Sequence, residues 1–183
     1  MCSCSKKSNL TKGLVALVIG FALFSMGAAK ASSSQHDSMK KTMRISLSPD
    51  TKQEVVKTLE ANEKLHLAFF EYNGETIEKE AKALIKAISS IKDSKISKLL
   101  KFSKTKLLEM KKGSSKEDNN QNYHLVSMAL IYIVGKYDVG SKYNAYSCPM
   151  VKKKWLQNSK KLSRVHNPYA SEMPHCGSQE TKH

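Results

Sequence analysis

Arginine is almost missing from this sequence, although positive charge is abundant. Only two of the 31 basic residues are arginines, Arg44 and Arg164, while the formal net charge at neutral pH is +15. Arginine is the residue that reads phosphates and bases through its planar, bidentate guanidinium group. Its scarcity disfavours a nucleic-acid partner. The many lysines, interspersed with glutamates, are typical of solvated helix faces, with attraction to an anionic lipid or polymer as the alternative.

The motifs of several enzyme classes are also missing. The sequence contains no glycine-rich phosphate loop, no paired-carboxylate motif and no Cys-x-x-Cys pair within a βαβ pattern. A cysteine hydrolase would need a general base and an oxyanion hole, and only His166 or His175 could be nominated as the base. We therefore expect a protein without catalytic activity.

The first 31 residues have the pattern of a signal peptide. Lysines precede an uncharged apolar run over 13–29, and Ala29-Lys30-Ala31 offers the small-x-small pattern of a signal-peptidase site. The apolar run is shorter than the roughly 20 residues that span a bilayer. We therefore expect cleavage before Ser32, with no stable membrane anchor afterwards, and secretion across an inner membrane into the periplasm.

The mature chain is predicted to be one domain preceded by a flexible segment. Cleavage would leave 152 residues with a formal net charge of +11, enough for one hydrophobic core. The segment 32–47 is polar and has too few apolar residues to offset the entropy of ordering. Within it, His36, Met39 and Met43 would align as soft-metal ligands on one face of a helix, with scattered residues in a disordered tail as the alternative.

Residues 48–177 have the hydrophobic period of helices over most of their length. Ser48-Pro49 is a helix start, and Asn73-Gly74 and Gly113 are stops. The β-branched run 131–134 could be a buried strand, but no second strand candidate is evident to pair with it. We therefore predict an all-α fold over 48–177: an antiparallel four-helix bundle with an additional short C-terminal helix and an irregular Cys/Met-containing tail. Residues 178–183 are expected to be disordered.

The rare residues of the chain are concentrated between Cys148 and Gly177. This stretch holds three of the four prolines, the only tryptophan and both cysteines outside the leader. Pro149 favours a new helix through about Lys161 with Cys148 at its N-cap, where the helix dipole would favour the thiolate. On that helix, Trp155 is expected to be an anchor in the core.

A turn is predicted after this helix at Asn167-Pro168-Tyr169, because asparagine and proline occupy the first two turn positions. The turn would bring the end of the chain back toward Cys148. Two thiols and two thioethers would then converge with an imidazole beside them, and such a sulfur-rich set selects Cu(I) or Ag(I) over zinc and harder ions. The predicted metal ligands are Cys148, Met150, Met173, Cys176 and His175.

Other interpretations of the same residues stay open. Cys148 and Cys176 could form a disulfide, closing a loop worth roughly 3–4 kcal/mol in an exported domain, or they could be unreactive thiols. Methionines such as Met150 and Met173 commonly fill gaps in a core. His175 could be an ordinary surface residue.

The order of residues in this stretch resembles a known family signature. The matching residues are Cys148, Pro149, Met150, Trp155, Leu156, Asn167, Pro168, Tyr169, Met173, Cys176 and Gly177. The order is similar to that of the uncharacterised family called domain of unknown function 3347. This sequence departs from the family at Ala170-Ser171, where a second aromatic residue and a glycine are usual, and His166 and His175 lie outside the signature.

The resemblance implies an exported, largely helical domain that occurs alone or joined to periplasmic adaptor proteins of copper/silver-type efflux pumps. From the residues and the resemblance together we predict a non-catalytic domain that binds Cu(I) or Ag(I) in envelope metal handling or efflux. The expected partner is a heavy-metal efflux adaptor or another envelope metal carrier. The alternative is a structural or interaction domain that is stapled by a Cys148–Cys176 disulfide and has no metal role.

Overall fold

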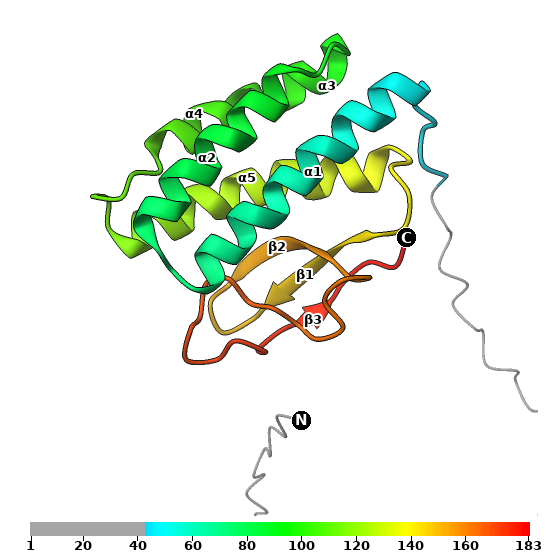
Figure 1. The fold of residues 1–183 in the computed structure, drawn as a ribbon. Helices are drawn as coiled ribbons and strands as arrows, with labels where there is room; N and C mark the ends of the chain where they lie inside the picture. Colours follow the sequence, from blue (N-terminus) through cyan, green and yellow to red (C-terminus); the bar gives the residue numbers. More distant parts are fainter. Residues whose placement is uncertain (1–42) are drawn as a thin grey trace, which may run out of the picture. The chain divides into compact units, whose positions relative to one another are not determined.

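Five helices and a three-stranded antiparallel sheet make up residues 43–183, the part of the chain that the computed structural model describes (Figure 1). The helices are α1 (Pro49–Phe70), α2 (Gly74–Ser89), α3 (Ser94–Leu99), α4 (Lys101–Glu109) and α5 (Lys116–Lys136). The strands are β1 (Tyr143–Cys148), β2 (Lys153–Asn158) and β3 (Ser178–Gln179). The proposed signal peptide lies outside the described residues, as do His36 and Met39.

Helix α1 begins at the predicted start, Ser48-Pro49, whereas Asn73, predicted to be part of a helix stop, is the N-cap of α2. The Ser48 hydroxyl caps α1 by accepting the Thr51 N–H at 3.3 Å, and the Asn73 side chain caps α2 by accepting the Thr76 N–H at 2.9 Å. The third predicted helix is divided into α3 and α4 at Leu100. None of the helices within 43–183 combines the length and apolar character that crossing a bilayer requires.

The all-α prediction is wrong after Lys136. The fourth helix of the predicted bundle is present as α5, but in place of the short C-terminal helix from Pro149 to Lys161, β1 and β2 form an antiparallel hairpin. Tyr146 lies opposite Trp155 in this hairpin. The protein is therefore a mixed α and β fold, with a helical layer packed on a small sheet (Figure 1).

The hairpin escaped sequence analysis because its polar residues find partners that are distant in sequence. Asn144 donates to the Ser159 hydroxyl at 3.0 Å, and Asn158 donates to the Glu63 carboxylate of α1 at 2.7 Å. Gln157 and Asn158 are buried although they interrupt any alternation of apolar and polar residues. A local hydrophobic period cannot indicate such a strand, because its polar side chains are satisfied only in the folded protein.

Both ends of the described chain are held by hydrogen bonds that involve the backbone, although they were expected to be disordered or flexible. The Ala145 N–H donates to the Thr181 hydroxyl at 2.9 Å, so residues 178–183, expected to be disordered, follow the edge of β1. At the other end, Ile45 forms a parallel bridge with Tyr137 inside the segment expected to be flexible. Met43 is 93% exposed, and its backbone precedes this bridge.

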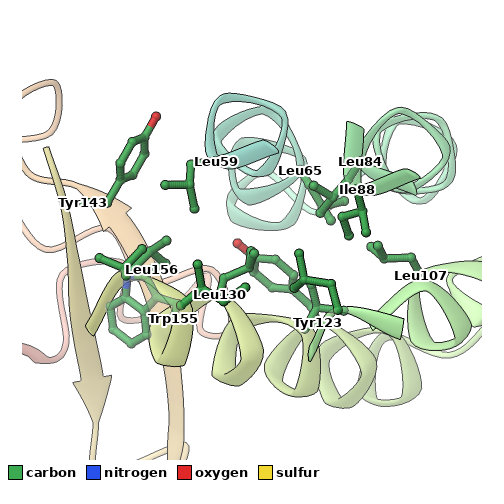
Figure 2. Packing of buried hydrophobic residues seen from close by; sticks show 14 of the residues in the cluster. Leu59, Leu65, Leu84, Ile88, Leu107, Tyr123, Leu130, Tyr143, Trp155 and Leu156 are labelled. Carbon is green, nitrogen blue, oxygen red and sulfur yellow. The ribbon is translucent and has the colours of Figure 1, made fainter. Parts of the chain in front are cut away.

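One apolar core runs from the sheet through α1 and α5 to α2 and α4. Figure 2 shows Trp155 and Leu156 of β2 beside Leu130 of α5, with Leu107 of α4 at the other end of the cluster. Trp155 is fully buried, so its predicted role as a core anchor is confirmed. The sheet is also held by Glu63 of α1, whose carboxylate accepts hydrogen bonds from Tyr143, Asn158 and Lys161.

Candidate functional site

Cys148 and Cys176 meet at one end of the sheet, and their Sγ atoms lie 3.0 Å apart. Cys148 is the last residue of β1, and Cys176 comes two residues before β3. Because Ser147 of β1 pairs with Ser178 of β3, the antiparallel register brings the two side chains together. The separation exceeds a disulfide bond of about 2.05 Å, so one thiol donates to the other sulfur.

The Cys148 thiol lies in surroundings that favour its ionised form. Burial raises its pKa, but hydrogen bonds from Cys176, from the backbone N–H groups of Val151 and Met150, and from Asn167 outweigh burial. The net result is a pKa below the ordinary value of a cysteine thiol. The sequence analysis expected a helix dipole to favour the thiolate, whereas the Cys176 thiol, together with the turn amides and Asn167, does so here.

Asn167 fixes the segment that returns Cys176 to the sheet. Its buried side chain donates to the Cys176 carbonyl at 2.9 Å and accepts the Tyr169 N–H at 2.9 Å. Its own N–H donates to the Pro174 carbonyl at 2.8 Å. The predicted turn at Asn167-Pro168-Tyr169 therefore exists and returns the chain toward Cys148.

Gly177 allows the closest approach of this returning segment to β1. Its φ is +137°, a conformation that L side chains rarely adopt. A Cβ atom there would lie 2.5 Å from the Ser147 carbonyl oxygen and 2.9 Å from the Trp155 ring. Only glycine fits this position without moving the backbone, so Gly177 sets the spacing of the cysteine pair.

The two predicted thioether ligands lie in the turns that carry the cysteines, but their side chains are exposed. Met150 is 69% exposed in the turn that follows Cys148. Met173 is 40% exposed, and its carbonyl accepts the Cys176 N–H at 2.9 Å. Both lie close to the cysteine pair along the chain, and neither is a gap-filling core residue.

His175 bonds a backbone carbonyl through one of its two ring nitrogens. Its Nδ1 lies 2.7 Å from the Val165 carbonyl oxygen, and its ring is exposed. In the part of the chain that the structure describes, no group of three or more His, Cys, Asp or Glu side chains could hold a metal ion. The structure therefore brings the two cysteines together, and it places Nδ1 of His175 against the Val165 carbonyl.

An open groove of about 250 Å³ runs over the Cys148 side of the pair. Its charged lining side chains are largely engaged in ion pairs: Lys154 contacts Glu180 at 2.8 Å, and Lys153 contacts Glu117 at 3.2 Å. Cys148 is only 1% exposed, yet it lines the groove. The groove thus lies directly over the buried Cys148 side chain.

A contact between the buried His66 and the half-buried His166 was missed by sequence reasoning. His66 of α1 is 2% exposed, and its Nε2 lies 3.0 Å from Nδ1 of His166. His166 stacks on Phe70 with ring centroids 3.3 Å apart. A small, mainly apolar cavity of about 60 Å³ lies beside His66. The available signal was the position of His66 on the apolar stripe of α1, beside Leu65 and Phe69.

Because of His66, the free energy of unfolding is expected to decrease as the pH is lowered through the mildly acidic range. Burial lowers its pKa to about 3, with the neighbouring His166 adding to the effect. In the unfolded chain the pKa of this histidine is about 6.5. Below this pH the unfolded state binds a proton that the folded state does not bind, and this favours unfolding. The free energy of unfolding should decrease by about 2 kcal/mol between pH 7 and pH 5.

Chemical denaturation at pH 7, 6 and 5 measures this loss. A His66→Phe variant should show a clearly smaller decrease over the same range, whatever its stability at pH 7. His175→Gln, on the exposed side of the returning segment, serves as the matched control and should keep the wild-type decrease. Equal decreases in wild type and His66→Phe would contradict the assignment.

No family model, curated protein or solved structure matches this chain. The resemblance to the domain of unknown function 3347 family therefore stays a prediction.

Proposed function

We propose that this chain is an exported, non-catalytic domain whose reduced Cys148–Cys176 pair binds one soft monovalent ion, Cu(I) or Ag(I). The single observation that carries the proposal is the 3.0 Å contact between the two sulfurs, one of which has a lowered pKa. Two adjacent thiols, one disposed to ionise, are the donors that soft metals select.

The geometry sets what binding requires. With metal–sulfur bonds near 2.3 Å, two thiolates on one ion lie about 4 Å apart or more, so the pair has to open by about 1 Å. Cys148 belongs to the last residue pair of the hairpin and Cys176 precedes β3, so the opening involves only the end of the sheet. Met150 and Met173, exposed in the adjoining turns, are the candidate additional ligands. His175 could add only its Nε2 atom, because its Nδ1 atom bonds the Val165 carbonyl.

The periplasmic location is proposed from the signal-peptide pattern of residues 1–31 and from the family resemblance. A periplasmic domain with a Cu(I) or Ag(I) site could store the ion or pass it to an efflux adaptor or another envelope metal carrier. The groove over Cys148 supports such a transfer, because it gives a partner's sulfur ligands a route to the ion.

A second function is favoured by the same contact. Oxidation would join Cys148 to Cys176 and tie the segment before β3 to the end of β1, which suits a structural or interaction domain without a metal role. The two candidates differ in what happens after reduction: a metal-binding pair then takes up Cu(I), whereas a purely structural pair does not.

Anaerobic competition of the reduced protein against a chromophoric Cu(I) chelator tests the proposal. We expect one Cu(I) per chain, and loss of this binding in Cys148→Ser and in Cys176→Ser. Met150→Leu and Met173→Leu should each weaken binding by about tenfold, because each removes one soft donor. Met128→Leu is the matched control, since Met128 is 41% exposed on α5. Absence of Cu(I) uptake by fully reduced wild type would leave only the structural function.

A further inference from the structure

The segment 92–112, which contains α3 and α4, carries most of the net positive charge of the described chain. Residues 43–183 hold 25 basic and 15 acidic residues, a net charge of +10, and this segment alone contributes eight lysines and two acids, a net charge of +6. Across 43–183, Lys106 is the one lysine of the eight in an ion pair, with Glu109 at 2.7 Å. The eight are Lys92, Lys95, Lys98, Lys101, Lys104, Lys106, Lys111 and Lys112.

Large apolar side chains are exposed among these lysines. Leu99 is 37% exposed, and Phe102 and Leu108 are each 57% exposed. Residues four apart share a helix face, so Lys104 adjoins Leu108 within α4. The Lys106 ammonium group lies 5.5 Å from the centre of the Phe102 ring. The inner side of the segment is mainly apolar as well, where its buried apolar side chains are Ile96, Leu100, Leu107 and Met110. The exposed apolar residues are therefore additional to those that the core requires.

This combination selects one class of partner. An acidic polymer would engage the lysines but leave the exposed Phe102 and Leu108 in water, and segment 92–112 has no arginine for reading nucleic acid. A bilayer with anionic lipids satisfies both kinds of residue. Its surface potential attracts lysine, the lysine stems lie along apolar surface, and aromatic and leucine side chains insert at the headgroup level.

We propose that segment 92–112 docks this protein onto the surface of an anionic lipid bilayer. In Figure 1, α3 and α4 lie on the side of the helical layer away from the sheet. Docking through this segment would therefore leave the groove over Cys148 open to the aqueous phase. The proposal rests on charge and exposure and does not depend on the metal-binding function.

Co-sedimentation of the full chain with phosphatidylcholine vesicles, with and without about one third phosphatidylglycerol, tests the proposal. We expect binding to increase with the anionic lipid and to fall in about 0.5 M salt, because exposed charges are then screened. The triple variant Lys95→Gln, Lys98→Gln, Lys101→Gln should bind about tenfold more weakly. All variants keep the same N-terminal residues, so any contribution of the apolar run 13–29 cancels in the comparison.

Two matched controls separate the docking segment from net charge and general hydrophobicity. The triple variant Lys57→Gln, Lys142→Gln, Lys160→Gln removes the same charge from exposed positions elsewhere and should bind like wild type. Phe102→Ser should weaken vesicle binding, whereas Met128→Ser on α5 should not. Equal binding of the two triple variants would overturn the proposal. Binding to polyglutamate without binding to anionic vesicles would overturn it too.

Discussion

Replacing Gly177 by alanine is expected to lower the free energy of unfolding by about 3 kcal/mol. The new Cβ would lie 2.5 Å from the Ser147 carbonyl oxygen, and the backbone would have to keep a φ of +137° that alanine disfavours. Relief of the clash requires the returning segment to move away from β1. We therefore also expect the Cys148–Cys176 pair to oxidise more slowly, because its sulfurs separate. Urea denaturation and the rate of thiol loss measure the two effects.

Gly135→Ala is the matched control for this prediction. Gly135 lies in α5, and a Cβ there would meet no atom within 4 Å. Alanine in a helix is favoured over glycine, so this variant should be more stable by about 0.5 kcal/mol. A Gly177→Ala protein as stable as wild type would show that segment 165–177 does not pack on β1 as described.

Oxidation of the cysteine pair is expected to raise the free energy of unfolding by roughly 3–4 kcal/mol. A bond between residues 148 and 176 closes a loop of 28 residues, and the loop-entropy relation gives this magnitude. Both sulfurs are already in contact, so the folded state needs little rearrangement to form the bond. Denaturation of oxidised and reduced samples gives the difference, with thiol counting on each sample.

A Cys148→Ser variant provides the control, because its stability should be independent of added oxidant. It also separates the two candidate functions. If the oxidised protein is strongly stabilised and the reduced protein binds no Cu(I), the structural function holds. If the reduced protein binds Cu(I) and loses it on oxidation, the pair is a redox-controlled metal site. Equal stability of oxidised and reduced wild type, with the disulfide verified, would contradict the predicted staple.

The sequence indicated which residues make up the candidate site, but not which groups favour the Cys148 thiolate or where the other side chains point. Clustering of rare residues pointed to Cys148 and Cys176, and turn chemistry at Asn167-Pro168-Tyr169 correctly returned the chain. The thiolate was expected at a helix start, whereas turn amides and Asn167 lower the pKa of Cys148. The exposed side chains of Met150 and Met173, and the contact of His175 with Val165, could not be derived from spacing, because side-chain direction depends on the packed neighbours.

The helical half of the fold was determined by the sequence alone. The Ser48 cap, and apolar residues at spacings of three and four, act within one or two turns, so their effect can be predicted from local sequence. These signals located α1 and α2 and the helical stretch that α3 and α4 share.

Only the tertiary structure decided the sheet and the position of the sulfur pair. Lys153, Lys154 and Gln157 give β2 no strand pattern, and its polar groups are satisfied by the Arg164 carbonyl and by α1 residues such as Glu63. Strand pairing is a non-local interaction, whose partners are known only after the chain has folded. Because β1 and β3 pair, the two cysteines, 28 residues apart in the chain, lie in contact at the edge of the groove.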